Sequence, residues 1–421
     1  MKTRVTFIHA ADLHLGAPFR GLRALSPAWA DRLLTAIPEA YDRLIDTAID
    51  HDVDFVIMAG DMFDMAEPSY ADYAHFFDGL HRLESAHIPV YMCAGNHDPY
   101  VSWRNDFGDL PDNAYMFPAD RPGFITYERH GRPLVLLGGR SYFNQSTPVD
   151  EDIARGISRV AAERACGVHA PFSVGVLHTG LDLDPKKAPT DPHQLRATNM
   201  DYWALGHIHK RQVDDPHDPH VAFSGCIQGR DIKETGARGC YEVTLTQDAP
   251  NMVNFISLAS VVWQKTNVDV SHCGTLAEVH DAIMGDLFRL NGKAQCEDMV
   301  ERVTLTGKTD LHHLLRQPEI IDDMRRKINN GYPSFFCDAL IDNTRPNISK
   351  KSLKNEGLFP ATLLRQSSGE RDDPEGSITW LQDRFLEEEL SLPRSYERNI
   401  ETMQRRAETI VLDLLEGGDD R

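Results

Sequence analysis

The chain has 421 residues and is 41% hydrophobic, which is enough for at least one large core and suggests two or three domains. No stretch is apolar for long enough to predict a membrane span, and Asp12 and His14 interrupt the N-terminal apolar run before a signal peptide could be complete. A formal net charge of −20 argues against extensive contact with phosphates, which Lys and Arg chiefly make, so any such contact must be local; the acidity fits an effect on solubility equally well.

Short β-rich apolar runs alternate with amphipathic stretches up to about residue 265, which is typical of an α/β domain. The expected strands are residues 4–9, 54–58, 89–93, 134–138, 173–178 and 202–205. Two apolar faces at helical spacing separate the first three strands. The first face consists of Ile37, Tyr41, Leu44, Ile45, Ala48 and Ile49, and the second of Tyr73, Phe76, Phe77, Leu80 and Leu83.

The pattern loosens near residues 264–274, and a second αβ segment follows. A helix is expected at residues 276–290, with strands at 302–306 and 334–340. From Glu370 onward acidic residues outnumber basic ones, and Pro393 separates two helical patterns. We therefore divide the chain into a domain at residues 1–265, a small αβ capping domain at 266–345 and a helical tail at 346–421.

The last helical pattern carries an apolar stripe that either packs on its own domain or forms a docking surface, and the sequence leaves both open. The stripe consists of Ile400, Met403, Ala407, Ile410, Val411, Leu414 and Leu415. Seven scattered cysteines, odd in number and without a CxxC pair, indicate a reducing cytoplasmic location and argue against a thiolate metal site.

Five short polar clusters each follow an expected strand. Any one of them alone is more often structural than ligating. Together they favour a single site, because ligands gather beyond the carboxyl ends of strands in α/β sheets. The clusters are Asp12-Leu13-His14, Gly60-Asp61-Met62-Phe63-Asp64, Gly95-Asn96-His97-Asp98, His178-Thr179-Gly180 and Gly206-His207-Ile208-His209.

These residue types suit a pair of divalent cations. Two cations about 3.5 to 4 Å apart can clamp the attacking and leaving oxygens of a displacement at phosphorus. Such a pair needs a bridging carboxylate, neutral imidazoles and oxygen donors, and the five clusters supply these without a thiolate. Ligands one residue apart, as in Asp12/His14 and His207/His209, project to the same side of an extended segment. The cations would also supply positive charge that this acidic chain lacks.

With these residues in view, the first 230 residues or so resemble the calcineurin-like metallophosphoesterase superfamily, whose pattern is DxH, GDxxD, GNHD/E, H and GHxH. By that resemblance one metal is held by Asp12, His14 and His209, the other by Asn96, His178 and His207, and Asp61 bridges them. The resemblance makes His97 a catalytic residue over the scissile phosphate and Asp98 its orienting partner. It makes Asp64 an outer residue that fixes a ligand.

Two longer stretches, residues 7–19 and 203–211, resemble bacterial DNA-repair nucleases of the SbcD and YhaO type. Residues 227–230 and 234–236 add to the likeness with the YhaO branch. The resemblance implies a four-layer sandwich of two sheets between helices. It also implies two divalent metals, Mn²⁺ as the preferred ion with Mg²⁺, Fe or Zn as substitutes, and exonuclease or endonuclease action on DNA in DNA repair. The partners implied are an SbcC-like coiled-coil ATPase and a second copy of the chain.

Eight basic residues near the clusters are candidate contacts for DNA phosphates, although each alone is more often solvated charge: Arg20, Arg140, Lys186, Lys187, Lys210, Arg211, Arg230 and Lys233. The sequence leaves two other functions open. One is a metallophosphatase or phosphodiesterase that acts on a non-DNA phosphoester. The other is a scaffold whose metals only stabilise the fold.

Overall fold

A computed structural model describes residues 3–18, 26–103, 109–146, 152–184, 187–188, 190–294, 296–331, 334–347, 359–388 and 390–416. The chain forms two units. The first consists of Met1–Gln264, Lys293–Val300 and Pro333–Asp338, and the second of Lys265–Gly292, Glu301–Tyr332 and Ala339–Arg421.

The first unit contains two six-stranded sheets. In the first sheet the strand order is β12-β11-β1-β2-β3-β4. Strands β1 (Arg4–Ala10), β2 (Phe55–Ala59), β3 (Val90–Cys93) and β4 (Ala114–Met116) run parallel. Strand β11 (Gly239–Thr246) pairs antiparallel with the other edge of β1, from Arg4 opposite Thr246 to His9 opposite Tyr241. Strand β12 (Met252–Ser257) closes that side of the sheet.

The second sheet has the order β5-β6-β7-β8-β10-β9. Strands β6 (Arg132–Arg140), β7 (Phe172–His178), β8 (Tyr202–Gly206) and β10 (Val221–Phe223) are parallel. The antiparallel strands β5 (Gly123–Arg129) and β9 (Gln212–Val213) form the two edges. The six strands expected from sequence are thus present as β1, β2, β3, β6, β7 and β8.

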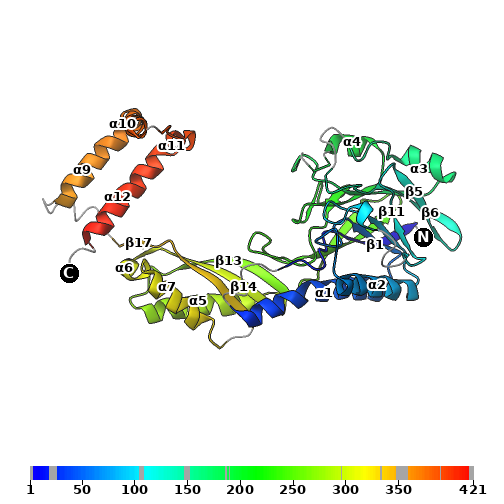
Figure 1. Cartoon of the computed structure of the whole chain (residues 1–421), viewed down its shortest axis with the longest axis horizontal. Coiled ribbons are helices and arrows are strands. Elements are labelled where there is room, and N and C mark those ends of the chain that lie inside the picture. The colour runs from blue at the N-terminus through cyan, green and yellow to red at the C-terminus, as the bar shows by residue number, and fades with distance from the viewer. Residues whose placement is uncertain are drawn as a thin grey trace. The chain divides into compact units, whose positions relative to one another are not determined.

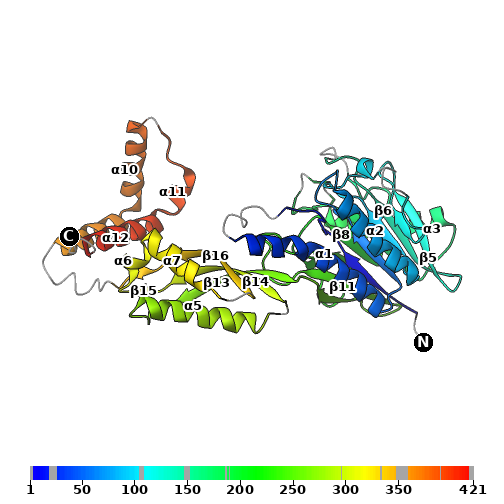
Figure 2. The same cartoon turned by 60° about the horizontal axis from the view of Figure 1, so that its bottom comes forward.

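Alternating side chains place each sheet between two apolar layers. On β1, Val5 and Phe7 face a core shared with the second sheet, while Ile8 and Ala10 face α1 (Pro27–Asp50) and α2 (Tyr70–Ser85). Figure 1 and Figure 2 show these two helices side by side along the first sheet. The far face of the second sheet packs against a region that includes α3 (Arg159–Cys166) and α4 (Pro192–Ala197). This arrangement confirms the expected four-layer α/β sandwich.

Serine caps fix where the two long helices begin. The Ser26 side chain accepts a hydrogen bond from the backbone N–H of Trp29, and Pro27 follows it in the first turn. Ser69 caps α2 in the same way through the N–H of Asp72. The two apolar faces read from the sequence are the buried faces of these helices.

In the second unit the main sheet has the order β13-β14-β16, and α5 (Leu276–Asn291) runs alongside it (Figure 1 and Figure 2). Its strands are β13 (Val261–Asp269), β14 (Asp298–Thr306) and β16 (Phe335–Asp342), and parts of them belong to the first unit. Smaller elements complete the segment: α6 (His312–Leu315), α7 (Pro318–Ile328), β15 (Lys308–Thr309) and β17 (Arg345–Pro346).

The described part of the tail contains α9 (Phe359–Asp372), α10 (Pro374–Glu387), α11 (Arg394–Arg398) and α12 (Ile400–Glu416), and Pro393 lies between α10 and α11, where the sequence places the separation of two helical patterns. Asp373 marks the start of α10: its side chain accepts from the N–H of Gly376, and Pro374 occupies the first turn. Helices α9, α10 and α12 contact one another. In the stripe on α12, Ile400 is buried but Ile410 and Val411 are exposed, and the side chains of Leu414 and Leu415 lie outside the described set.

Within the described residues, no helix combines the length and the apolarity needed to cross a lipid bilayer. All seven cysteines are free thiols.

Candidate metal centre

The five polar clusters meet at the carboxyl ends of parallel strands from both sheets. Asp12 and His14 follow β1, Asp61 and Asp64 follow β2, and the Asn96-His97-Asp98 segment follows β3. His178 is the last residue of β7, while His207 and His209 follow β8. The site is therefore built across the first unit by segments as much as 195 residues apart.

Four of the clustered residues adopt a backbone conformation that side chains normally avoid. The φ angles of Asp12, His14, Asp61 and His207 are +51°, +50°, +52° and +97°. Such residues are held by the surrounding structure and concentrate at functional sites. Here the loops hold each other: the N–H of Asp12 donates to the carbonyl of Gly60, and the N–H of His14 donates to that of Asp61, each at 3.0 Å.

Glycines allow the loops to approach closely. A Cβ atom at Gly206 would lie 1.9 Å from the carbonyl oxygen of Ala59. At Gly95 it would lie 2.1 Å from Oδ1 of Asp61. The glycines in the Gly-His and Gly-Asn pairs are therefore needed for packing around the polar side chains.

The first group of donors contains Asp12, His14 and His209, whose ligand atoms lie within 4.8 Å of one another. The Nε2 atoms of His14 and His209 are 3.1 Å apart, and Nε2 of His209 is 4.0 Å from Oδ1 of Asp12. Asp12 and His14 are almost completely buried. These donors converge on one point.

The second group contains Asn96, His178 and His207. Oδ1 of Asn96 lies 3.3 Å from Nε2 of His178 and 3.1 Å from Nδ1 of His207. Oδ2 of Asp61 lies 3.3 Å from Nε2 of His178 in this group and 3.7 Å from Nε2 of His14 in the first group. Asp61 thus stands between the two groups.

Each of the four imidazoles has an acceptor at the ring nitrogen that faces away from the centre. Nδ1 of His178 donates to the carbonyl of Ala59 at 2.9 Å, and Nδ1 of His209 contacts Glu234 at 2.5 Å. Nε2 of His207 contacts Oδ2 of Asp184 at 3.2 Å. Such partners fix the tautomer and leave the opposite nitrogen with its lone pair toward the centre.

The remaining ring, His14, contacts Asp64. Its Nδ1 lies 3.0 Å from Oδ1 of Asp64, a close polar contact that falls short of a hydrogen bond in its geometry. Asp64 also accepts from Nη1 of Arg230 at 2.7 Å. The chain therefore surrounds the two donor groups with an outer layer of carboxylates and carbonyls.

The electrostatics of the centre suit a cation. Burial lowers the pKa of His14 and of His207, so both rings are neutral donors near pH 7. Burial alone would lower the pKa of His178, but the charge of Asp61 raises it to about 9. A buried carboxylate thus draws positive charge to this position. Neutral imidazoles, carboxylates and an amide oxygen fit a divalent ion.

The His97 ring lies beside these donors and is more exposed than the four imidazoles of the two donor groups. Its side chain is 41% exposed, and its ring packs edge-on to that of His14 at a centroid distance of 4.9 Å. Nδ1 of His97 donates to the backbone carbonyl of Asp64 at 2.8 Å, and its backbone N–H donates to Oδ1 of Asp61 at 2.9 Å. Nε2 is therefore the nitrogen left for a substrate.

The contacts of the Asp98 side chain differ from those expected of a residue that orients His97. Its carboxylate accepts backbone N–H groups from Gly95 at 2.8 Å, Met62 at 2.9 Å and Asp61 at 3.2 Å. Asp98 lies in the loop after β3 and accepts N–H groups of Asp61 and Met62 in the loop after β2. Its carboxylate therefore connects the two loops. The contact with the His97 ring comes from Asp64 instead.

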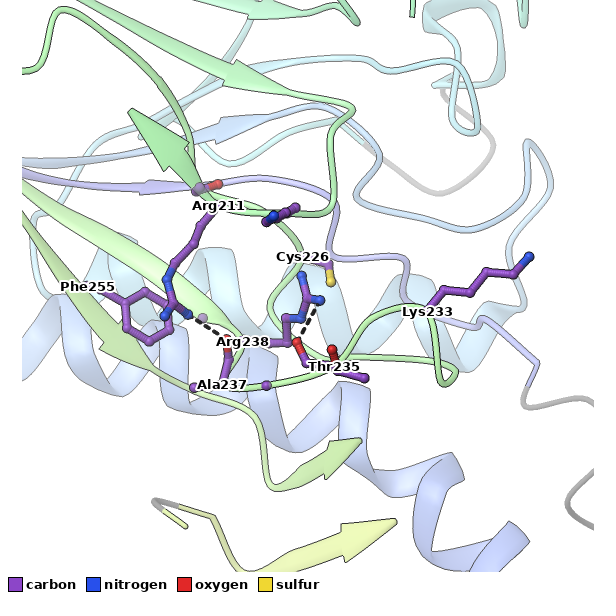
Figure 3. A pocket seen from close by; sticks show the side chains of 11 residues that line it. Arg211, Cys226, Lys233, Thr235, Ala237, Arg238 and Phe255 are labelled. Atoms are coloured by element: carbon purple, nitrogen blue, oxygen red, sulfur yellow. Dashed lines mark hydrogen bonds between the residues drawn. The ribbon is translucent and has the colours of Figure 1, made fainter. Parts of the chain in front are cut away.

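The eight basic residues proposed as phosphate contacts do not share one place. Lys210, Arg211 and Lys233 line a common pocket, and Figure 3 labels Arg211 and Lys233 in it. Arg230 pairs with Asp64 and Glu234, and Nε of Arg140 donates to the carbonyl of Ala119. Lys187 is half-buried in the loop after β7. Arg20 and Lys186 lie outside the described residues.

Sequence reasoning did not assign a role to two carboxylates of the outer layer, Glu234 and Asp184. Glu234 belongs to the Glu-Thr-Gly stretch after β10, and burial alone would raise its pKa, but the hydrogen bond from His209 lowers it to about 2. Neither residue lies in a periodic pattern. For Glu234, the signal in the sequence was that residues 234–236 resemble the YhaO branch.

Comparison with known proteins gives two family matches. Residues 5–211 match the calcineurin-like phosphoesterase family, and residues 263–345 match the middle domain of metallophosphoesterase YhaO. The uncharacterized metallophosphoesterase YhaO of Bacillus subtilis is 33% identical over 322 residues, which cover 76% of each chain.

Other relatives are DNA double-strand break repair proteins named Mre11. That of Methanococcus maripaludis is 35% identical over 228 residues, covering 52% of this chain and 55% of the relative. That of Haloferax volcanii is 26% identical over 263 residues, covering 59% and 50%. The chain thus matches about half the length of these two relatives. A crystal structure of a dimetal phosphatase from Danio rerio aligns with 60% of this chain and 99% of its own, at 12% identity and a TM-score of 0.35.

Proposed function

Since this chain belongs to the calcineurin-like metallophosphoesterase family, in its YhaO branch, we propose that it is a divalent-metal-dependent DNA nuclease that hydrolyses phosphodiesters by a two-metal mechanism. Family membership makes it a hydrolase of phosphoester bonds. The observation that carries the finer proposal is the pair of donor groups around Asp61 with the exposed His97 imidazole beside them.

In this proposal Asp12, His14 and His209 hold one ion, Asn96, His178 and His207 hold the other, and Asp61 bridges them. The donor set contains imidazole, carboxylate and amide oxygen, which suits Mn²⁺ and also admits Mg²⁺, Fe or Zn. Bound divalent ions would polarise the phosphodiester and lower the pKa of the attacking water. The protein holds the donors in place through the outer contacts of each ring.

His97 is the proposed catalytic imidazole. Because Nδ1 donates to the carbonyl of Asp64 and the side chain is 41% exposed, Nε2 is the nitrogen that can stabilise developing charge or give a proton to the leaving oxygen. Asp64 is a positioning residue, since its carbonyl orients His97 while its carboxylate contacts His14. Asp98 positions the loops through their backbone N–H groups.

DNA is the proposed substrate because the matched relatives include proteins named for repair of DNA double-strand breaks. The direct test is to incubate the purified chain with linear DNA in Mn²⁺, with EDTA as the metal-free control. We expect DNA cleavage that depends on the metal. Turnover of bis(p-nitrophenyl) phosphate together with no action on any DNA, alone or with an ATPase partner, would favour a phosphodiesterase for a smaller substrate.

The proposal extends to the rest of the chain. Residues 266–345 form the capping domain and residues 346–421 the segment that docks a coiled-coil ATPase of the SbcC kind, in a homodimeric assembly of the cytoplasm. Exposed apolar side chains on α10 support docking, since Trp380 is 60% and Leu386 73% exposed. Co-purification of the ATPase with the full chain, and its loss in a Trp380→Ala/Leu386→Ala variant, is the expected result. Equal binding of the ATPase by the unsubstituted chain and by the variant would contradict the docking role.

A further inference from the structure

A pocket of about 360 Å³ in the first unit gathers positive charge on a strongly acidic protein. Its lining includes Lys210, Arg211, Lys233 and Arg238, and among the described residues no carboxylate lines it. Figure 3 shows Arg211 against Phe255 on one side, Arg238 and Cys226 in the middle and Lys233 extended on the other side. In a chain with a net charge of −20, four cations in one pocket mark it as a local site for an anion.

The two arginines are fixed by the protein. Arg238 is only 9% exposed and donates to three backbone carbonyls, those of His209, Thr235 and Glu234. The guanidinium of Arg211 lies 3.9 Å from the centre of the Phe255 ring and donates from Nη1 to the carbonyl of Ala237 at 2.7 Å. Neither group needs to be ordered further when an anion enters.

The two lysines are exposed and available. In the part of the chain that the structure describes, neither Lys210 nor Lys233 forms an ion pair. The one nearby carboxylate that contacts Lys233, that of Asp231, accepts its backbone N–H at 2.7 Å. Two unpaired ammonium groups beside two fixed guanidinium groups form a site with spare positive charge.

The pocket also adjoins the metal centre. Arg238 and the Cys226 thiol both donate to the carbonyl of His209, the Cys226 contact being 3.7 Å long. Glu234, which contacts the His209 ring, is followed in the chain by Thr235 in the pocket lining. An anion in the pocket would therefore sit next to the segment that carries a proposed metal ligand.

We propose that this pocket binds a backbone phosphate of the nucleic-acid strand, at a position flanking the phosphodiester that is cleaved. The inference rests on the proposed nuclease function and adds the place where the strand is held. The shared chemistry is a phosphate group, which a free nucleotide or inorganic phosphate could also supply. The strand is favoured because the site is open, adjoins the centre and presents exposed lysines, which suit phosphates that must slide in and out.

The test compares two double variants of the full chain. Lys210→Ala/Lys233→Ala removes two pocket cations, and Arg121→Ala/Lys293→Ala removes two exposed cations elsewhere in the first unit. DNA affinity is measured over a range of salt concentrations, together with turnover of bis(p-nitrophenyl) phosphate in Mn²⁺. All four positions are exposed, so both variants should fold, and circular dichroism checks this.

We expect the pocket variant to bind DNA about 10-fold more weakly at low salt, with the slope of log affinity against log salt reduced by about one for each lysine. The loss should be the same for different DNA sequences because phosphate contacts carry no sequence information. Turnover of the small diester by the control variant should match that of the unsubstituted protein.

Equal DNA affinities and salt slopes in the two double variants would overturn the proposal. So would a loss of affinity for inorganic phosphate or AMP in the pocket variant with unchanged DNA binding, since the pocket would then serve a free phosphate. Failure of the unsubstituted protein to cut DNA in Mn²⁺ is a separate result, and it would count against the nuclease function itself.

Discussion

The Nε2 atoms of His14 and His209 face each other at 3.1 Å, although 195 positions separate the two residues in the chain. Each ring contacts a carboxylate with its other nitrogen, so its proton belongs on the far side. Two lone pairs at this distance cannot form a hydrogen bond with each other. A cation between them would satisfy both, and this geometry underlies the predictions that follow.

Replacing Asp61 should change how many metals the protein holds. Asp61→Asn removes the charge that stands between the two donor groups, at 3.7 Å from His14 and 3.3 Å from His178. We expect the bound Mn²⁺ to fall from two ions per chain to one or fewer, measured by metal analysis after dialysis. Two tightly bound ions in the variant would show that Asp61 does not bridge.

Replacing His97 should separate catalysis from metal binding. In His97→Ala the proposed donors are unchanged, while the group that serves the leaving oxygen is gone, so kcat should fall by about 10² to 10⁴. Metal content should stay at the level of the unsubstituted protein. His217→Ala, at an exposed loop position, is the control and should keep full activity. Full activity in His97→Ala as well would remove His97 from its role.

Glu234 should set the affinity of the ion held by His209. Its carboxylate contacts Nδ1 of that ring and also pairs with Arg230. Glu234→Gln should weaken Mn²⁺ binding by about 10- to 100-fold, as expected for a lost outer partner. The control is Glu84→Gln, which breaks a similar pair with His81 on the exposed surface of α2. Isothermal titration of Glu84→Gln with Mn²⁺ should give the affinity of the unsubstituted protein. Equal Mn²⁺ affinities in Glu234→Gln and Glu84→Gln would argue against the role of Glu234.

Two Gly→Ala substitutions should have opposite effects on stability. At Gly206 a new Cβ would meet the carbonyl of Ala59, so Gly206→Ala should destabilise the first unit by about 1–3 kcal/mol or more. Gly285 lies inside α5 with open space around its Cβ, so Gly285→Ala should stabilise by about 0.5–1 kcal/mol. Chemical denaturation measures both. A neutral Gly206→Ala would mean that the strand end can shift.

Much of the fold followed from local patterns. The strands of the central sheets and the buried faces of α1 and α2 were predictable because burial on one side imposes a fixed spacing on apolar residues. The gathering of Asp12 and Asp61 was predictable too, since the parallel strands of one sheet place their carboxyl ends at the same edge. In the tail, Pro393 lies between α10 and α11 as expected, while the further boundary between α11 and α12 was not predicted.

The surroundings of the site were harder to predict. Asp98 lies next to His97 in sequence, yet its carboxylate turns inward to the N–H groups of neighbouring loops. Arg230 lies near the site as expected, but Asp64 and Glu234 engage its charge. Glu234 and Asp184 come from loops, where no periodicity indicates which way a side chain points. Tertiary contacts determine where these side chains point, and the spacing of apolar residues in the sequence does not encode those contacts.

The antiparallel pairing of β1 with β11 has a consequence for synthesis of the protein. One edge of β1 gains its neighbour only after residues up to Thr246 of β11 have been translated. His207 and His209 also emerge late, after the ligands on the loops following β1, β2 and β3. His207 belongs to the second donor group and His209 to the first, so a nascent chain that has not reached these residues lacks part of both groups.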